Sequence, residues 1–323
     1  MKAANRLTTS ILITALLAAP LSWSAAALAD EPAEVRFAVP AWPGVTVKSE
    51  LAGQLLAALG YEPQLLALGS TITYEALNQG DVDVYLAAWL PGQGSTYDAA
   101  MEKGVIADLG NNVDGARLGF AVPTYVFDAG VTSGADLENP ELREKFDGTI
   151  YSIEVGSGIS EILRRGVDEN IYSLADWHIS ETSTPGMLSS VEAAIDREEW
   201  IVFGAWTPHW MNVEYDVRYL DDPDDLWGEE GGRSDVRTLV TQTFAETHPN
   251  ATRLLDQLSF SADDQSAMIF GFSAEERPAD EVALEWLRSH PERVEAFLDG
   301  VTTRDGDQDA WPVVQEALQI SAH

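Results

Sequence analysis

Strand-like and helix-like segments alternate along this chain. Residues 34–39 (EVRFAV), 62–68 (EPQLLAL) and 81–89 (DVDVYLAAW) are predicted to be strands. Residues 45–60 carry apolar side chains at helical spacing and end at a glycine, and residues 70–80 form a second helical segment. Consecutive parallel strands need a crossover, usually a helix, so this order predicts a mostly parallel sheet covered by helices.

A second alternation of the same kind follows. Residues 116–127 are predicted to be extended and residues 199–206 to form a strand, with helices at 158–167 and 186–198. The remainder, from about Asp235, is predicted to be mainly helical. Two successive α/β units indicate an α/β protein with two lobes.

The N-terminal residues have the pattern of an export signal. Lys2 and Arg6 precede an apolar stretch, and Ala27-Leu28-Ala29 forms a small-x-small site, which predicts a signal peptide over 1–29 with cleavage before Asp30. The alternative is an uncleaved anchor helix. The chain has no cysteine, so neither a disulfide nor a lipid-anchored cysteine is expected, which favours a periplasmic protein.

The chain is strongly acidic, with 53 Asp and Glu against 19 Lys and Arg and a net charge of -34. Such a charge excludes nucleic acid as a partner, because nothing would neutralise its phosphates. The acids are scattered rather than clustered. This favours adaptation to a salty exterior over attraction of cations to one site.

The usual constellations of an enzyme are missing from the sequence. It contains no Gly-x-Ser-x-Gly elbow, no cysteine nucleophile and no phosphate loop, and the five histidines lack metal-ligand spacing. Residues 305–316 resemble a calcium loop, but Ala310 replaces the required glycine and Pro312 breaks the pattern. We therefore expect no enzyme activity, cofactor or metal. The abundant carboxylates leave an exported α/β hydrolase as the alternative from another class.

Three tryptophans follow one rule of placement. Trp42, Trp89 and Trp206 each lie at the carboxyl end of a predicted strand, with a proline one or two residues later. Ligands of open α/β sheets bind beyond this end of the strands. Tryptophan is also the best cation–π partner, so the three rings predict a cage for a methylated ammonium group, which cannot donate a strong hydrogen bond. The alternative is that they are ordinary core residues.

The helix predicted after Gly44 suggests a second half for the site. Free N–H groups at a helix N-terminus attract anions, so the amides of Val45 and Thr46 are candidates to hold a carboxylate. We expect Lys48 to point to solvent, because a cation in the first turn opposes the helix dipole. Ser157, in the turn VGSGIS, is a further candidate donor, or this segment is a plain strand-to-helix turn.

At these residues the chain resembles a known family, the substrate-binding proteins of ABC importers for glycine betaine, choline and proline betaine. The likeness is carried by the segments AWPGVTVKSELAGQLLAALGYE, TYEALNQGDVDVYLAAWLP, GARLGFAVPTYV, IYSIEVGSG and FGAWTPHWMN, with YLDDP. The resemblance implies a two-lobed periplasmic binding protein with a ligand cleft between the lobes. It implies lobe 1 at residues 30–114 plus 218–323 and lobe 2 at 115–217.

Two departures from the choline-binding branch of that family bear on the ligand. A fourth ring, a tyrosine, is expected where this chain has Leu118, and an aspartate where it has Gly44. Tyr125 or Trp210 is then a candidate fourth wall, and His209 is a candidate carboxylate donor or a structural residue. The missing acid favours a zwitterion with a carboxylate.

The resulting hypothesis is a monomeric, periplasmic binding protein for glycine betaine or a close relative, which delivers its ligand to an ABC transporter permease in the membrane. Choline, carnitine, dimethylsulfoniopropionate and trimethylamine oxide are the alternative ligands.

Overall fold

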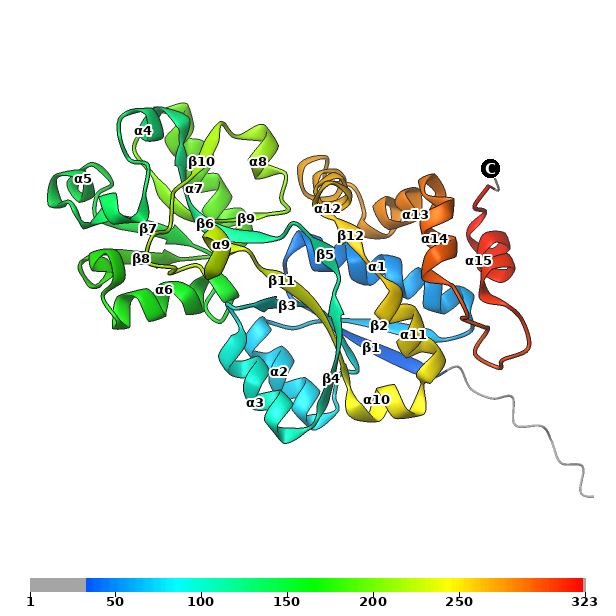
Figure 1. Cartoon of the computed structure of the whole chain (residues 1–323). Helices are drawn as coiled ribbons and strands as arrows, with labels where there is room; N and C mark the ends of the chain where they lie inside the picture. Colours follow the sequence, from blue (N-terminus) through cyan, green and yellow to red (C-terminus); the bar gives the residue numbers. More distant parts are fainter. Residues whose placement is uncertain (1–32, 322–323) are drawn as a thin grey trace, which may run out of the picture. The chain divides into compact units, whose positions relative to one another are not determined.

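The computed structural model describes residues 33–321, and the predicted signal peptide lies outside them. The described chain has two hydrophobic cores, each built around its own five-stranded sheet (Figure 1). We refer to each sheet with its core as a lobe. Both lobes belong to one compact unit, Pro32–His323.

The first lobe is built on a mixed sheet in the order β2-β1-β3-β11-β4. Its strands are β1 (Glu34–Val39), β2 (Glu62–Ala67), β3 (Val84–Leu90), β4 (Ile106–Asn111) and β11 (Asp235–Thr241). Strands β1, β2 and β3 are parallel, as predicted, but β11 runs antiparallel to both β3 and β4. The helical prediction from Asp235 was therefore wrong for its first seven residues.

The second lobe is built on a sheet in the order β10-β6-β9-β7-β8. Its strands are β6 (Arg117–Pro123), β7 (Thr149–Ser152), β8 (His178–Glu181), β9 (Val202–Thr207) and β10 (Val217–Tyr219). Strand β6 is antiparallel to β9 and β10, so this sheet is also mixed. The short strands β5 (Val113–Asp114) and β12 (Phe260–Ser261) pair separately.

The helices fill the connections between strands and form most of the C-terminal part. They are α1 (Pro43–Ala58), α2 (Ser70–Gln79), α3 (Gly94–Lys103), α4 (Thr124–Asp128), α5 (Pro140–Lys145), α6 (Gly158–Asp168), α7 (Thr184–Asp196), α8 (Met211–Glu214), α9 (Glu229–Gly232), α10 (Gln242–Thr247), α11 (Pro249–Gln257), α12 (Ala262–Ile269), α13 (Ala279–Ser289), α14 (Pro291–Phe297) and α15 (Ala310–Leu318).

The chain passes between the two cores twice. Ala116 belongs to the first core and Leu118 to the second; on the return, Trp227 belongs to the second core and Val236 to the first. The two crossings lie side by side, because the Ser234 amide donates to the Ala116 carbonyl over 2.9 Å. Residues 218–227, which the sequence analysis assigned to lobe 1, pack with the second lobe.

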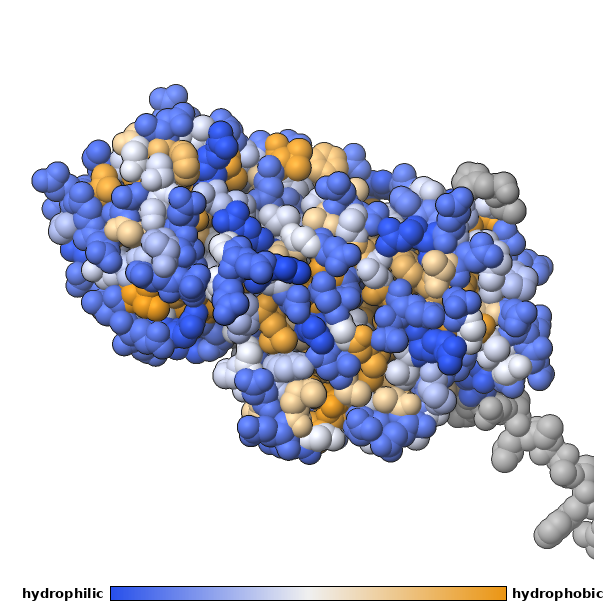
Figure 2. Space-filling view, in the orientation of Figure 1, coloured by the Kyte–Doolittle hydropathy of each residue, from blue (hydrophilic) through white to orange (hydrophobic). Residues whose placement is uncertain are grey.

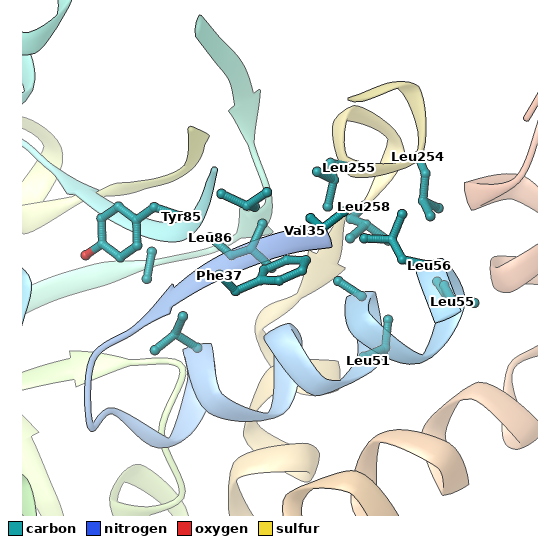
Figure 3. Packing of buried hydrophobic residues seen from close by; sticks show 14 of the residues in the cluster. Val35, Phe37, Leu51, Leu55, Leu56, Tyr85, Leu86, Leu254, Leu255 and Leu258 are labelled. Carbon is teal, nitrogen blue, oxygen red and sulfur yellow. The ribbon is translucent and has the colours of Figure 1, made fainter. Parts of the chain in front are cut away.

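Helix α1 shows how the sequence builds the first core. Leu51 and Leu55 lie on one face of the helix at helical spacing, and they pack toward Val35 and Phe37 on β1 (Figure 3). Leucines of α11 close the same cluster. This packing fixes where α1 begins, which matters because its first turn reaches the site described below.

The face of the molecule in Figure 2 is dominated by hydrophilic residues, in keeping with the acidic composition. Within residues 33–321 no helix combines the length and the apolar character that a membrane crossing requires.

Candidate functional site

A pocket of about 600 Å³, counting the space that opens to solvent, lies between residues of the two lobes. Trp42, Trp89 and Trp206 all line it. Trp42 follows β1, whereas Trp89 and Trp206 are the next-to-last residues of β3 and β9. The two lobes therefore bring together the three rings that the strand-end rule selected.

Each tryptophan is fixed by its own hydrogen bonds. The Trp42 indole Nε1 donates to the Glu154 carboxylate of the opposite lobe. The Trp89 amide donates to Oε1 of buried Gln93 over 3.1 Å, and the Trp206 carbonyl accepts from Asn212 Nδ2 over 2.9 Å. These bonds limit the movement of the Trp42 ring and of the backbone at Trp89 and Trp206, which is what a preformed binding site requires.

The other pocket walls near the three tryptophans are apolar. Leu118 is the partner of Trp206 across the β6–β9 ladder, and Val236 is the partner of Trp89 across β3–β11. Both line the pocket, together with Ile153 and Ile159. The described lining contains no aspartate or glutamate. A cation here would be held by ring faces and exclusion of water rather than by an ion pair.

The N-terminus of α1 opens onto the same pocket. Pro43, Gly44 and Val45 line it, and the N-cap residue Trp42 makes no side-chain cap hydrogen bond. Pro43 has no N–H, so the two free donors of the first turn are the amides of Gly44 and Val45. The positive end of a 16-residue helix thus faces the pocket, which suits an anionic group.

Two neighbouring candidate residues, Thr46 and Ser157, already make hydrogen bonds to residues close to them in the chain. The Thr46 amide donates to the Trp42 carbonyl over 3.1 Å as part of the helix, so it is not the free donor that the sequence suggested. Ser157 lines the pocket, and its hydroxyl oxygen caps α6 by accepting from the Ser160 amide over 3.1 Å. The hydroxyl hydrogen of Ser157 remains able to donate.

Lys48 was expected in solvent, and this expectation was wrong. It lines the pocket, its side chain is buried, and Nζ donates to the Leu86 carbonyl over 2.9 Å and to Asn112 Oδ1. Burial lowers the pKa of Lys48 to about 7. The sequence did contain a signal, because Lys48 shares the helical stripe of Leu51, Ala52 and Leu55.

This buried lysine predicts a dependence of stability on pH. The pKa of Lys48 is about 7 in the folded protein against an ordinary value of 10.5, so between these values the unfolded chain binds the additional proton. The free energy of unfolding should therefore increase as the pH rises from 7 to 9, by up to about 1.4 kcal/mol per pH unit. Below pH 7 both states are protonated and this contribution to the slope disappears.

Urea denaturation of the wild type and of Lys48→Met at pH 7, 8 and 9 measures this slope. The Met variant should lose the increase, whereas Lys103→Met, at an exposed position at the end of α3, should keep it. Parallel pH profiles for the wild type and Lys48→Met would contradict the prediction.

Three further candidates do not line the pocket: Tyr125, His209 and Trp210. The Tyr125 hydroxyl donates to the Glu199 carbonyl over 2.6 Å, so this side chain is tied to another part of the second lobe. His209 packs edge-on against Trp206 at 4.7 Å between ring centroids and on Trp210 at 5.4 Å. Its Nδ1 accepts from the Met211 amide, and burial lowers its pKa to about 3. His209 is therefore a neutral residue that supports the Trp206 ring.

Contacts across the pocket hold the two lobes together. Besides the Trp42–Glu154 bond, the Ser70 hydroxyl donates to the Gly156 carbonyl. Gly92 and Gly158 approach so closely that a Cβ on Gly92 would lie 2.6 Å from the Gly158 Cα. The lobes are closed on one another in this structure.

The acidic segment that resembles a calcium loop is held by hydrogen bonds within the loop. Asp305 accepts hydrogen bonds from the Thr303 hydroxyl and from the Asp307 amide. Across residues 33–321 no group of three or more His, Asp or Glu is arranged to hold a metal ion.

Comparison with known proteins places this geometry in context. The model of the OpuAC family, described as the substrate binding domain of an ABC-type glycine betaine transport system, matches residues 33–289. The glycine betaine/carnitine transport binding protein GbuC of Listeria monocytogenes is 30% identical over 168 residues. That match covers 52% of this chain and 55% of GbuC, so it spans about half the length of that relative.

Two solved structures are similar over most of this chain. An ABC-transporter choline binding protein in complex with choline is 30% identical, with a TM-score of 0.84, covering 88% of this chain and 98% of that one. Lactococcal OpuAC, closed around glycine betaine, is 25% identical, with a TM-score of 0.74, covering 82% and 99%. These relatives bind solutes for transport and are not enzymes. The chain belongs to the family of two-lobed, extracytoplasmic substrate-binding domains of ABC-type glycine betaine transport systems.

Proposed function

We propose that this chain binds glycine betaine, or a close relative carrying both a methylated ammonium group and a carboxylate, for uptake by an ABC importer. The observation that carries the proposal is a pocket with three tryptophans, an uncapped helix N-terminus and no acidic side chain in its described lining. The three tryptophans suit a cation that has no hydrogen-bond donors, and the helix N-terminus suits an anion. We call these two parts of the pocket the cationic pole and the anionic pole.

The cationic pole would be formed by Trp42, Trp89 and Trp206. A desolvated ring face contributes about 0.5–2 kcal/mol to binding of a cation. Trp42 and Trp206 are each only 8% exposed, so water competes weakly for the space over these rings. The Trp42 N–H bond to Glu154 draws the negative carboxylate to the ring edge, which supports cation binding at the ring face.

The anionic pole would be formed by the Gly44 and Val45 amides. Lys48 lies four residues after Gly44, on the same face of α1, and adds a partly protonated ammonium group to this side of the pocket. Ser157 is a further candidate donor. Choline has no carboxylate to accept hydrogen bonds from these donors. These residues therefore favour glycine betaine or carnitine over choline.

Uptake would use closure of the two lobes, the second spanning about 117–227. Ligand contacts from both lobes exist together only in the closed state, so binding favours closure. The closed protein would then dock, as a monomer, on a membrane permease. We further infer that the chain is exported to the periplasm by cleavage of the signal peptide at 1–29 and needs no cofactor.

Titration calorimetry against glycine betaine, carnitine, choline, dimethylsulfoniopropionate and trimethylamine oxide tests the proposal. We expect the tightest binding for glycine betaine or a related carboxylate, and binding of choline at least tenfold weaker, which corresponds to about 1.4 kcal/mol. Choline as the preferred ligand would overturn the zwitterion assignment. Absence of binding to all five compounds would overturn the function.

A further inference from the structure

We propose that Gln265 is a specificity-determining residue that donates a hydrogen bond from its side-chain amide to the carboxylate of the bound ligand. The inference rests on the proposed function and extends it, because it adds a side chain to the anionic pole. Gln265 lies on α12, about 220 residues from the first turn of α1 along the chain, and the sequence analysis did not select it.

The buried state of the Gln265 side chain supports this role. Gln265 is 2% exposed and lines the pocket. Its Nε2 is buried, and among the described residues it has no hydrogen-bond partner. Buried amide groups are nearly always hydrogen-bonded, because leaving a donor unpaired forfeits its hydration without compensation. A ligand acceptor in the pocket supplies the missing partner.

The Gln265 amide group also lies next to the first turn of α1. A Cβ on Gly44 would lie 3.2 Å from Gln265 Oε1, so the glutamine amide group lies beside the start of the helix. Gln265 and the free amides of Gly44 and Val45 thus line one side of the pocket. A carboxylate offers about four lone-pair sites, so it can accept from all three N–H donors at once.

Helix α12 holds Gln265 in a fixed position. The helix begins with a capping box, in which Ser261 and Asp264 exchange hydrogen bonds, and Arg293 Nη1 donates to the Asp264 carboxylate over 3.3 Å. Gln265 shares the buried stripe of Met268 and Ile269, and Ile269 also lines the pocket. A glutamine on such a stripe is placed by packing, which lets one hydrogen bond discriminate between ligands.

The test compares a ligand that has a carboxylate with one that lacks it. Gln265→Met keeps the volume and removes the donor. We expect its affinity for glycine betaine to fall about tenfold, while its affinity for tetramethylammonium stays within about twofold of the wild type. The melting temperature should not fall, because an unpaired buried amide has been removed. Equal changes for both ligands, or none for either, would overturn the role of Gln265.

Gln265→Glu provides a readout that a packing role would not give. A carboxylate at this position repels the ligand carboxylate and attracts a cation, so glycine betaine should bind at least tenfold more weakly and tetramethylammonium more tightly. Affinities of this variant that move in the same direction would also contradict the inference.

The control is Gln257→Met on neighbouring α11. The Gln257 amide already donates to the Phe297 carbonyl over 2.6 Å, so both affinities should stay unchanged. If wild-type protein binds neither ligand, the proposed function itself fails. If it binds glycine betaine and both Gln265 variants bind it equally well, only the Gln265 inference fails.

Discussion

Replacing Gly92 by alanine should weaken glycine betaine binding about a hundredfold while leaving both lobes folded. Gly92 lies between β3 and α3, and Gly158 begins α6 in the other lobe. A Cβ on Gly92 would lie 2.6 Å from the Gly158 Cα and 2.9 Å from its carbonyl carbon and oxygen. All three are backbone atoms, so rotation of a side chain cannot relieve the clash. The added methyl group would therefore clash with Gly158 in the closed state, whereas in an open state the two lobes are apart and no clash arises.

The expected loss follows from the population of the closed state. Apparent affinity scales with the fraction of protein that can bind, so a clash that makes closure about a hundredfold rarer weakens binding by about the same factor. Calorimetry measures this loss, and small-angle scattering should show that the variant does not contract when ligand is added. The melting temperature of the ligand-free variant should match that of the wild type.

Gly94→Ala is the matched control for this prediction. Gly94 lies two residues after Gly92 as the first residue of α3, and a Cβ added there meets no atom within 4 Å. Its affinity should equal that of the wild type. Wild-type affinity in Gly92→Ala would show that the contact between Gly92 and Gly158 is not part of the ligand-bound state.

That Trp42, Trp89 and Trp206 would line one pocket could be predicted, because their placement follows a local rule. Trp42, Trp89 and Trp206 each follow or end a strand that is recognisable from its apolar run, and ligands of α/β sheets bind beyond this end of the strands. The strands belong to two sheets, one in each lobe, which face the same pocket. The residues next to Trp206 along the chain were less predictable. His209 and Trp210 lie just beyond β9 where α8 begins, and neither residue belongs to the pocket lining.

The antiparallel strand β11 could not be placed by the same reasoning. It inserts between β3 and β4, more than a hundred residues earlier in the chain, and this pairing is specified by long-range packing rather than by local pattern. Lys48 and Gln265 were not assigned to the pocket for a different reason. Both lie on buried helical stripes, so their periodicity was visible, but polar residues are exposed so often that periodicity alone did not reveal the pocket.

Removing the rings of Trp42, Trp89 and Trp206 should strongly weaken glycine betaine binding. Each of Trp42→Ala, Trp89→Ala and Trp206→Ala removes a ring face and opens the pocket to water, and we expect a loss of about 10- to 100-fold for each. The triple variant should show no measurable binding. Trp311→Ala is the control, because Trp311 is half-buried on α15 and does not line the pocket.

A ligand of the same shape without the positive charge separates the electrostatic contribution of the rings from their shape. In 3,3-dimethylbutanoate a carbon replaces the ammonium nitrogen, so the ligand keeps its size and carboxylate and loses its positive charge. The wild type should bind it at least tenfold more weakly than glycine betaine. The preference should shrink in each single Trp→Ala variant, because a cation–π partner has gone. If all three single variants keep the full preference for the charged ligand, the rings only shape the pocket and the cation must be recognised by another group.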